Sequence, residues 1–222
     1  MTLRLYYHPF SSYCQKVLIA LYERRVPFDR QIIDLGASDQ RAALQALWPL
    51  AKFPVLRDES RGVTVPDSTV IIEYLDSRHS GPAPMIPRDP EAALSVRLRD
   101  RFFDAYVMTP MQKVVADNFR PDGRRDPQGV EDAKALLAKA YGIIDSRFLE
   151  GSRWIAGDTF SLADCSAAPA LFYANIALPF SGHKQLEAYS ERLLARPSFT
   201  RAVDEARPYR TLFPLEWPES YR

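Results

Sequence analysis

The fold is decided by residues 3–34, which read LRLYYHPFSSYCQKVLIALYERRVPFDRQIID. LRLYY has the pattern of a half-buried strand, and PFDRQIID returns to the same alternation. Between them, residues 12–24 follow a helical period, and one stripe of this helix carries Val17, Leu18, Leu21 and Tyr22. The stretch therefore predicts a strand, a helix and a second strand, the opening of a βαβ unit.

The chain that follows completes a small α/β domain. A polar, helix-like segment at 39–48 precedes two short strands, PVLRD and GVTVP, which are close enough in sequence to pair as a hairpin. DSTVIIEYLDSR then predicts a helix, with Asp67 or Ser68 as its N-cap. The resulting order βαβαββα indicates a small mixed sheet with helices on its faces.

A proline-rich segment separates this α/β domain from the rest of the chain. Residues 81–90 read GPAPMIPRDP, whose four prolines in ten residues are typical of a stiff, extended connector. We place a first domain at 1–80, the linker at 81–90 and a second domain at 91–222. The second domain is predicted to be all-α, with helices at 91–118, 129–149, 162–176, 184–194 and 198–206.

Composition excludes several classes of protein. The chain has 222 residues, with 29 Lys and Arg against 28 Asp and Glu, and this balance argues against a nucleic-acid partner. The most apolar stretch, residues 167–180, is shorter than the roughly 20 residues that cross a bilayer, and no signal peptide is apparent. Two distant cysteines form no disulfide framework. We therefore expect a cytoplasmic protein without a membrane partner.

Patterns for metal, nucleotide or triad chemistry do not occur in the sequence. None of the three histidines, His8, His79 and His183, has a second ligand at metal-binding spacing. GxGxxG, Walker and GxSxG motifs are also missing. We therefore expect no metal site, and neither zinc hydrolysis nor esterase chemistry.

Three short segments of the first domain are candidates for one binding site. Ser11 and Ser12 stand where the first strand meets the first helix, and a hydroxyl there can cap the helix, donate to an anion, or do both. Lys52-Phe53-Pro54 precedes a strand, where Pro54 either initiates the strand or, in a cis bond, leaves the Phe53 backbone available to an extended peptide. Asp67-Ser68 stands at the start of the last helix of this domain, where it can cap the helix or bind a carboxylate.

Taken together, these motifs give the chain a resemblance to the cytosolic glutathione transferases, and to their serine-type, theta- and zeta-like members in particular. The resemblance covers essentially the whole chain and implies a thioredoxin-like first domain followed by an all-helical domain. The residues that carry it are Ser11-x-x-Cys14, Lys52-Phe53-Pro54-Val55-Leu56, Asp67-Ser68-x-x-Ile71-x-x-Tyr74-Leu75 and Gly157-Asp158-x-x-Ser161-Leu162-Ala163-Asp164.

The resemblance implies that glutathione is the co-substrate and assigns a catalytic serine. Ser11 occupies the position of the serine that hydrogen-bonds the glutathione sulfur, with Ser12 as the second candidate. Ser161-x-x-Asp164 resembles the family's structural capping box, which serves folding. Cys14 has no CxxC partner, and we interpret it as a small buried residue.

Binding roles follow for the other two segments. Phe53, before a cis-Pro54, would pair its backbone with the cysteinyl part of glutathione, and Lys52 would meet the glycyl carboxylate. Ser68 would hold the γ-glutamyl carboxylate, and Asp67 the ammonium group.

The sequence leaves the second substrate open. Tyr13 stands where zeta-like isomerases usually have a cysteine, which argues against a specific maleylacetoacetate isomerase. The leading hypothesis is conjugation of glutathione to a small apolar electrophile; a glutathione-dependent isomerase or dehalogenase, and a non-catalytic binding or regulatory subunit, are the alternatives. The residues proposed for the wall of the electrophile site are Phe103, Tyr106, Tyr173 and Phe213.

A two-fold homodimer is the expected assembly. Transferases of this family pair the first domain of one chain with the helical domain of the other. The helix at 91–118 also carries more large apolar residues than one bundle face can bury, namely Leu94, Leu98, Phe102, Phe103 and Tyr106.

Overall fold

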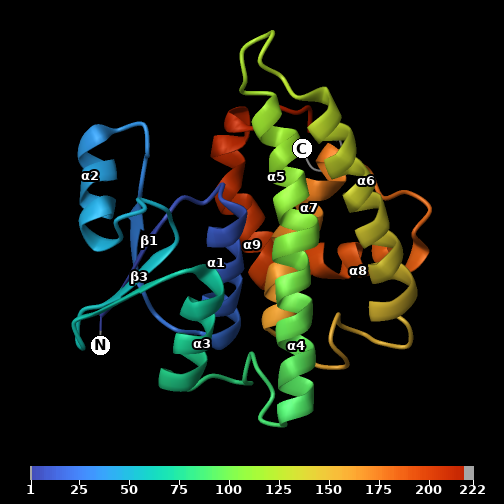
Figure 1. The fold of residues 1–222 in the computed structure, drawn as a ribbon. Helices are drawn as coiled ribbons and strands as arrows, with labels where there is room; N and C mark the ends of the chain where they lie inside the picture. Colours follow the sequence, from blue (N-terminus) through green and yellow to red (C-terminus); the bar gives the residue numbers. More distant parts are fainter. Residues whose placement is uncertain (1, 218–222) are drawn as a thin grey trace.

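The computed structural model describes residues 2–217, and it contains an α/β domain followed by an all-helical domain (Figure 1). The sheet has the strand order β2-β1-β3-β4, in which β1 pairs parallel with β2, and the other pairs are antiparallel. The predicted order βαβαββα is confirmed, with β1 (Leu3–Tyr7), α1 (Ser12–Arg24), β2 (Asp29–Ile32), α2 (Ser38–Leu47), β3 (Val55–Asp58), β4 (Val63–Pro66) and α3 (Ser68–Arg78).

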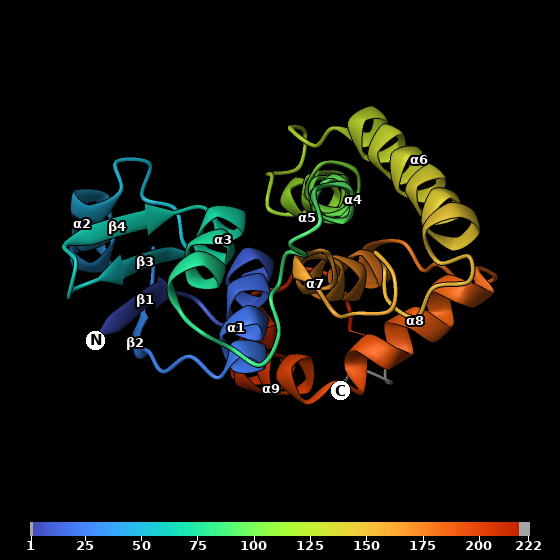
Figure 2. The same ribbon diagram turned by 90° about the horizontal axis from the view of Figure 1, so that it is seen from below.

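Helices cover both faces of the sheet. Figure 2 shows α1 and α3 on the face toward the helical domain and α2 on the opposite face. The alternation of β1 decides this arrangement, because Leu3, Leu5 and Tyr7 are buried in the large core that runs on into the helical domain. A smaller cluster under α2 contains Leu44 and Val55.

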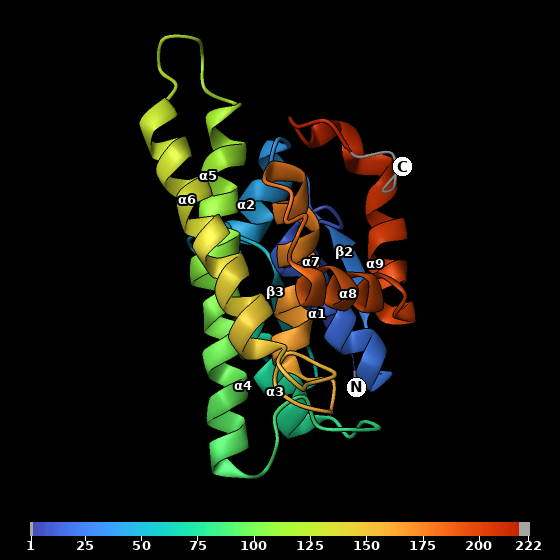
Figure 3. The same ribbon diagram turned by 90° about the vertical axis from the view of Figure 1, so that its right-hand side faces the viewer.

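The second domain is all-helical, as expected. Its elements are α4 (Pro90–Phe102), the π-helical turn η1 (Phe103–Met108), α5 (Thr109–Asp117), α6 (Pro127–Ile143), the π-helical turn η2 (Ile144–Phe148), α7 (Leu162–Ala177), α8 (Lys184–Leu194), α9 (Pro197–Ala206) and the 3₁₀ turn η3 (Arg207–Leu212). Figure 3 shows α4 and α5 as one long column with α6 beside it.

Helix starts differ from the sequence prediction by one or two residues, for a common reason. The predicted helices at 91–118 and 129–149 begin at Pro90 and Pro127, because proline fits the first helical position, where no N–H is needed. Asp89 and Asp126 cap these helices: their carboxylates accept from the N–H groups of Ala92 and Gly129, at 2.8 and 2.9 Å. The turn η3 was not expected from the sequence.

The domains meet through α1, which packs against α7 and α9. The start of α7 is fixed by the predicted capping box, which is confirmed: Asp164 accepts from the Ser161 N–H at 2.9 Å. The linker is tied to the same place, since the Leu162 N–H donates to the Met85 carbonyl at 2.9 Å. The first turn of α1 is held against the same helix, since the side-chain amide of Gln15 donates to the Tyr173 hydroxyl at 3.0 Å.

Candidate active site

Two cavities lie beside the first turn of α1, and each is lined by residues of both domains. The first, which we call the polar cavity, has a volume of about 380 Å³ and is lined by Tyr13, Trp48, Leu50, Lys52, Phe53, Pro54, Asp67, Ser68, Arg101, Asp104, Ala105 and Thr109. The second, the apolar cavity, has a volume of about 410 Å³ and is lined by Phe10, Ser11, Ser12, Met111, Gln112, Val115, Ala116, Phe119, Tyr173 and Phe213. The polar cavity thus brings together all five residues proposed to bind glutathione, and the apolar cavity holds both candidate catalytic serines.

Ser11 and Ser12 differ in what their hydroxyls do. Ser11 is the N-cap of α1, and its oxygen accepts from the Cys14 N–H at 3.4 Å. The same hydroxyl also lies within hydrogen-bonding reach of the Cys14 thiol, whose pKa it acts to lower against the larger effect of burial. Ser12 is buried, and its hydroxyl donates to the Met108 sulfur at 3.2 Å. Each hydroxyl thus has only a weak sulfur acceptor, but Ser11 is partly exposed at the positive end of a helix, whereas Ser12 is buried.

The segment Lys52-Phe53-Pro54 forms one wall of the polar cavity. The Phe53–Pro54 peptide bond is cis, as expected. β3 begins immediately afterwards at Val55, because a proline nitrogen cannot donate to the sheet. The Lys52 side chain is exposed and forms no ion pair with the described residues, so its ammonium group is available to a carboxylate.

Asp67 and Ser68 form a second wall of the polar cavity. Asp67 has a φ of 75° and is the N-cap of α3, and its Oδ1 accepts from the N–H groups of Thr69 and Val70 at 2.9 and 3.2 Å. The sequence left Asp67 and Ser68 as candidates for this N-cap, and the structure shows that the cap is Asp67. Because Oδ1 makes both capping bonds, Oδ2 remains for a ligand, and the buried Ser68 presents its hydroxyl to the same cavity.

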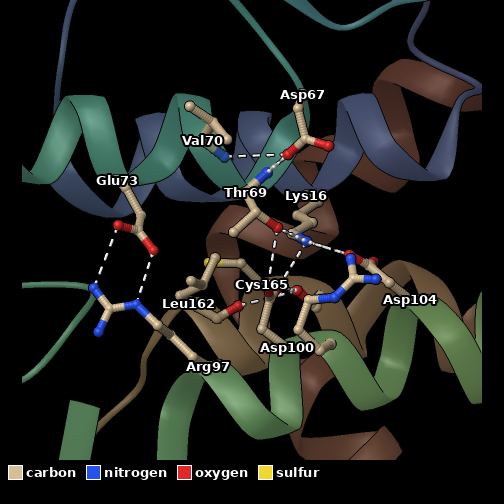
Figure 4. A network of polar contacts seen from close by, with 12 residues as sticks. Lys16, Asp67, Thr69, Val70, Glu73, Arg97, Asp100, Asp104, Leu162 and Cys165 are labelled. Carbon is tan, nitrogen blue, oxygen red and sulfur yellow. Dashed lines mark hydrogen bonds and ion pairs between the residues drawn. The ribbon is translucent and has the colours of Figure 1, made fainter. Parts of the chain in front are cut away.

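A buried ionic network lies behind this wall (Figure 4). The Lys16 Nζ is 2.6 Å from Asp100 and 3.2 Å from Asp104, and it donates to the Thr69 hydroxyl at 2.8 Å. Thr69 in turn donates to Asp100 at 2.9 Å, and Ser166 donates to the other oxygen of Asp100. Burial raises the pKa of Asp104, while Lys16 acts in the opposite direction. The network connects α1 and α3 with α4, η1 and α7.

The residues proposed for the electrophile wall do not all lie together. Tyr173 and Phe213 line the apolar cavity beside the serines. Phe103 lies instead in the core with no exposed surface, and Tyr106 is 49% exposed outside both cavities. Helical periodicity identifies the apolar stripe of this helix, but it does not say which part of the stripe faces a cleft.

Several residues of the cavities were missed by the sequence analysis. The apolar cavity also contains Phe10, from the turn before α1, and Met111, Gln112, Val115, Ala116 and Phe119, from α5 and its C-terminal end. In the polar cavity, Arg101 and Asp104 come from the helical domain. The only available signal was their place on a long amphipathic helix, and this does not reveal a contact with the first domain.

Cys14 is fully buried, and burial raises its pKa to about 12. This agrees with the interpretation of Cys14 as a small buried residue, and the raised pKa disfavours the reactive thiolate. Among residues 2–217, no group of three acidic, histidine or cysteine side chains is placed to hold a metal ion. No helix in the described part of the chain is long and apolar enough to cross a membrane.

Comparisons with known proteins agree with this architecture. The family model "Glutathione S-transferase, N-terminal domain" matches residues 5–83, and the corresponding C-terminal domain model matches residues 127–192. The chain is 27% identical to a glutathione S-transferase from Silene vulgaris over 91% of this chain and 97% of the relative. It is 28% identical to a stringent starvation protein A homolog from Haemophilus influenzae over 88% and 87% of the two chains. A glutathione S-transferase structure from Methylobacillus flagellatus with glutathione bound superposes with a TM-score of 0.81, at 28% identity, over 90% of this chain and 98% of that one.

Proposed function

The chain belongs to the glutathione S-transferase family, and we propose that it joins the sulfur of glutathione to a neutral, apolar electrophile, with Ser11 as the residue that stabilises the thiolate. The observation that carries the proposal is the position of Ser11 in the apolar cavity, next to the cavity that holds the proposed glutathione residues. The partial exposure of Ser11 at the start of α1 favours it over the buried Ser12. A cytoplasmic location remains part of this proposal.

The lining of the apolar cavity supports a neutral substrate. Its described lining residues include no charged side chain, and its polar groups are the two serines, Gln112 and the hydroxyl of Tyr173. The proton of the Tyr173 hydroxyl already has an acceptor, since it is donated to the Phe10 carbonyl at 3.0 Å. A substrate carrying carboxylates would lose its hydration here without gaining a cationic partner, which is costly. Conjugation of an apolar electrophile is therefore favoured over isomerisation of a diacid.

Retention on immobilised glutathione, followed by assays with a panel of electrophiles, tests the proposed function. We expect retention, and turnover with neutral aryl or alkyl halides but not with dicarboxylates. Loss of halide without conjugate accumulation would identify the dehalogenase alternative. Retention without turnover of any electrophile would identify a non-catalytic binding subunit.

Removing the charge of Asp67 should weaken glutathione binding by about 1.5 kcal/mol, or roughly tenfold, because the ammonium group of glutathione loses an ionic partner. Asp67→Asn is the appropriate variant, since asparagine tolerates a positive φ and keeps an oxygen for the two capping bonds. Calorimetry measures the affinity, and thermal unfolding verifies that α3 remains capped. Unchanged affinity would remove Asp67 from the binding site.

A homodimer is proposed as the assembly, with the outer face of α4 covered by the partner. Leu94 and Leu98 lie one helical turn apart, and they are 63% and 59% exposed. Such large apolar side chains on one face favour a protein contact, and a closed two-fold pair is the commonest solution. Light scattering at micromolar concentration should give twice the chain mass of 25.3 kDa. A mass near 25.3 kDa would refute the dimer.

A further inference from the structure

We propose that Tyr13 is a further binding residue of the polar cavity, and that its phenol donates a hydrogen bond to the γ-glutamyl carboxylate of glutathione. The proposal rests on the proposed function, because it identifies a contact to the same co-substrate. It starts from a departure in the sequence, since Tyr13 replaces the residue expected in zeta-like relatives.

The geometry of α1 separates Tyr13 from the serines. Ser11 and Ser12 line the apolar cavity, whereas Tyr13 lines the polar cavity. Successive helical residues point about 100° apart, so one turn of helix can serve two cavities. The first turn of α1 therefore forms the partition between them, and it directs an aromatic hydroxyl to the side where the peptide would bind.

The hydroxyl of Tyr13 has an unfilled hydrogen-bonding capacity. The side chain is half-buried, yet no described residue accepts its proton. A hydroxyl that is withdrawn from water without a partner costs free energy, and a ligand acceptor in the cavity would recover it. Burial raises the pKa of Tyr13 to about 12, so the phenol stays protonated and acts as a donor at neutral pH.

The surroundings of the phenol point to the γ-glutamyl end of the peptide. The polar cavity places Tyr13 together with Asp67, Arg101 and Asp104; the two carboxylates raise the pKa of Tyr13, and Arg101 lowers it. At this end the cavity offers carboxylates for an ammonium group, and Ser68, Arg101 and the start of α3 for a carboxylate. A neutral phenol donor complements the second set without adding charge.

A comparison of two ligands tests this contact. Binding of glutathione, and of 4-aminobutyryl-cysteinylglycine, which lacks the γ-glutamyl carboxylate, is measured by calorimetry with the wild type and Tyr13→Phe. We expect Tyr13→Phe to weaken glutathione binding by about tenfold and to leave binding of the analogue unchanged. Tyr6→Phe is the matched control, since it removes a phenol hydroxyl from β1 outside both cavities, and it should bind both ligands as the wild type does.

Two results would overturn the inference while leaving the proposed function intact. Equal glutathione affinity of Tyr13→Phe and wild type would show that the hydroxyl makes no contact. An equal loss for both ligands would place the contact elsewhere on the peptide. Failure of the wild type to bind glutathione would instead overturn the proposed function, and this inference with it.

Discussion

Replacing Ser11 with alanine is expected to lower the rate of conjugation by about tenfold or more, with little change in glutathione affinity. A free thiol has a pKa of about 8.5, so only a few per cent of it is thiolate at neutral pH. Lowering this pKa by about two units requires roughly 2.7 kcal/mol. One charge-assisted hydrogen bond, at about 1.5–3 kcal/mol, and a helix terminus, at about 0.3–1 kcal/mol, supply this amount. Under the proposed function, Ser11 would contribute the hydrogen bond, and α1 would contribute the helix terminus.

The decisive measurement is the pKa of the bound thiol, followed by thiolate absorbance against pH. Ser11→Ala should raise this pKa and move the pH–rate profile upward by the same amount. Because Ser11 also caps α1, the variant loses about 1 kcal/mol of stability, and the assays need to be run well below its unfolding temperature.

Ser12→Ala is the matched control. The Ser12 proton is engaged by Met108, so its loss should leave the thiol pKa near the wild-type value. If Ser12→Ala raises the pKa and Ser11→Ala does not, the catalytic serine is Ser12.

The fold was predictable because its signals are local. Each strand and helix of the first domain has its own period in the sequence, and the caps at Asp67 and Ser161 lie within a few residues of the groups they satisfy. The proposed glutathione residues could be nominated for the same reason, since each sits at the start of a helix or strand. The structure adds that they line a single cavity.

The walls of the cavities could not be predicted from local patterns. Phe103 and Phe213 are both aromatic residues in the helical half, yet Phe103 fills the core and Phe213 faces a cavity. This difference depends on distant partners, because η1, which contains Phe103, packs against α7, whereas the Phe213 ring meets Phe10 before α1. No period within one helix encodes either contact. The separation of Tyr13 from Ser11 likewise appears only when both cavities are placed around α1.

Lys16 is the clearest case of a residue whose importance lies in distant partners. It precedes the apolar run Val17 to Leu21 of α1, and its side chain is only 1% exposed. Its partner Asp100 is also 1% exposed and is 84 positions away in the sequence. The pair joins the helix that carries Ser11 to the helical domain, and Thr69 links it to the helix that begins at Ser68.

Replacing Lys16 with methionine should therefore destabilise the protein by about 3–5 kcal/mol, which is the usual cost of leaving one member of a buried ion pair without its partner. Methionine fills a similar volume, so the loss reports the unpaired carboxylate of Asp100 and not a cavity. Asp104 is less affected, because Arg101 lies 3.5 Å from it. Denaturant unfolding at neutral pH measures the effect.

The double variant Lys16→Met/Asp100→Asn distinguishes charge from shape. Its neutral amide keeps one oxygen for the Ser166 hydroxyl, and its NH₂ group can donate to the Thr69 oxygen, which no longer accepts from Lys16. The variant also removes the buried charge. We expect it to be more stable than Lys16→Met alone, because a buried charge without a partner costs more than a missing pair. If the single variant is as stable as the wild type, the network contributes nothing to holding the domains together. If the double variant is less stable than the single one, Asp100 is stabilised mainly by its hydroxyl partners and not by Lys16. The position of α3 beside the polar cavity then does not depend on the ion pair.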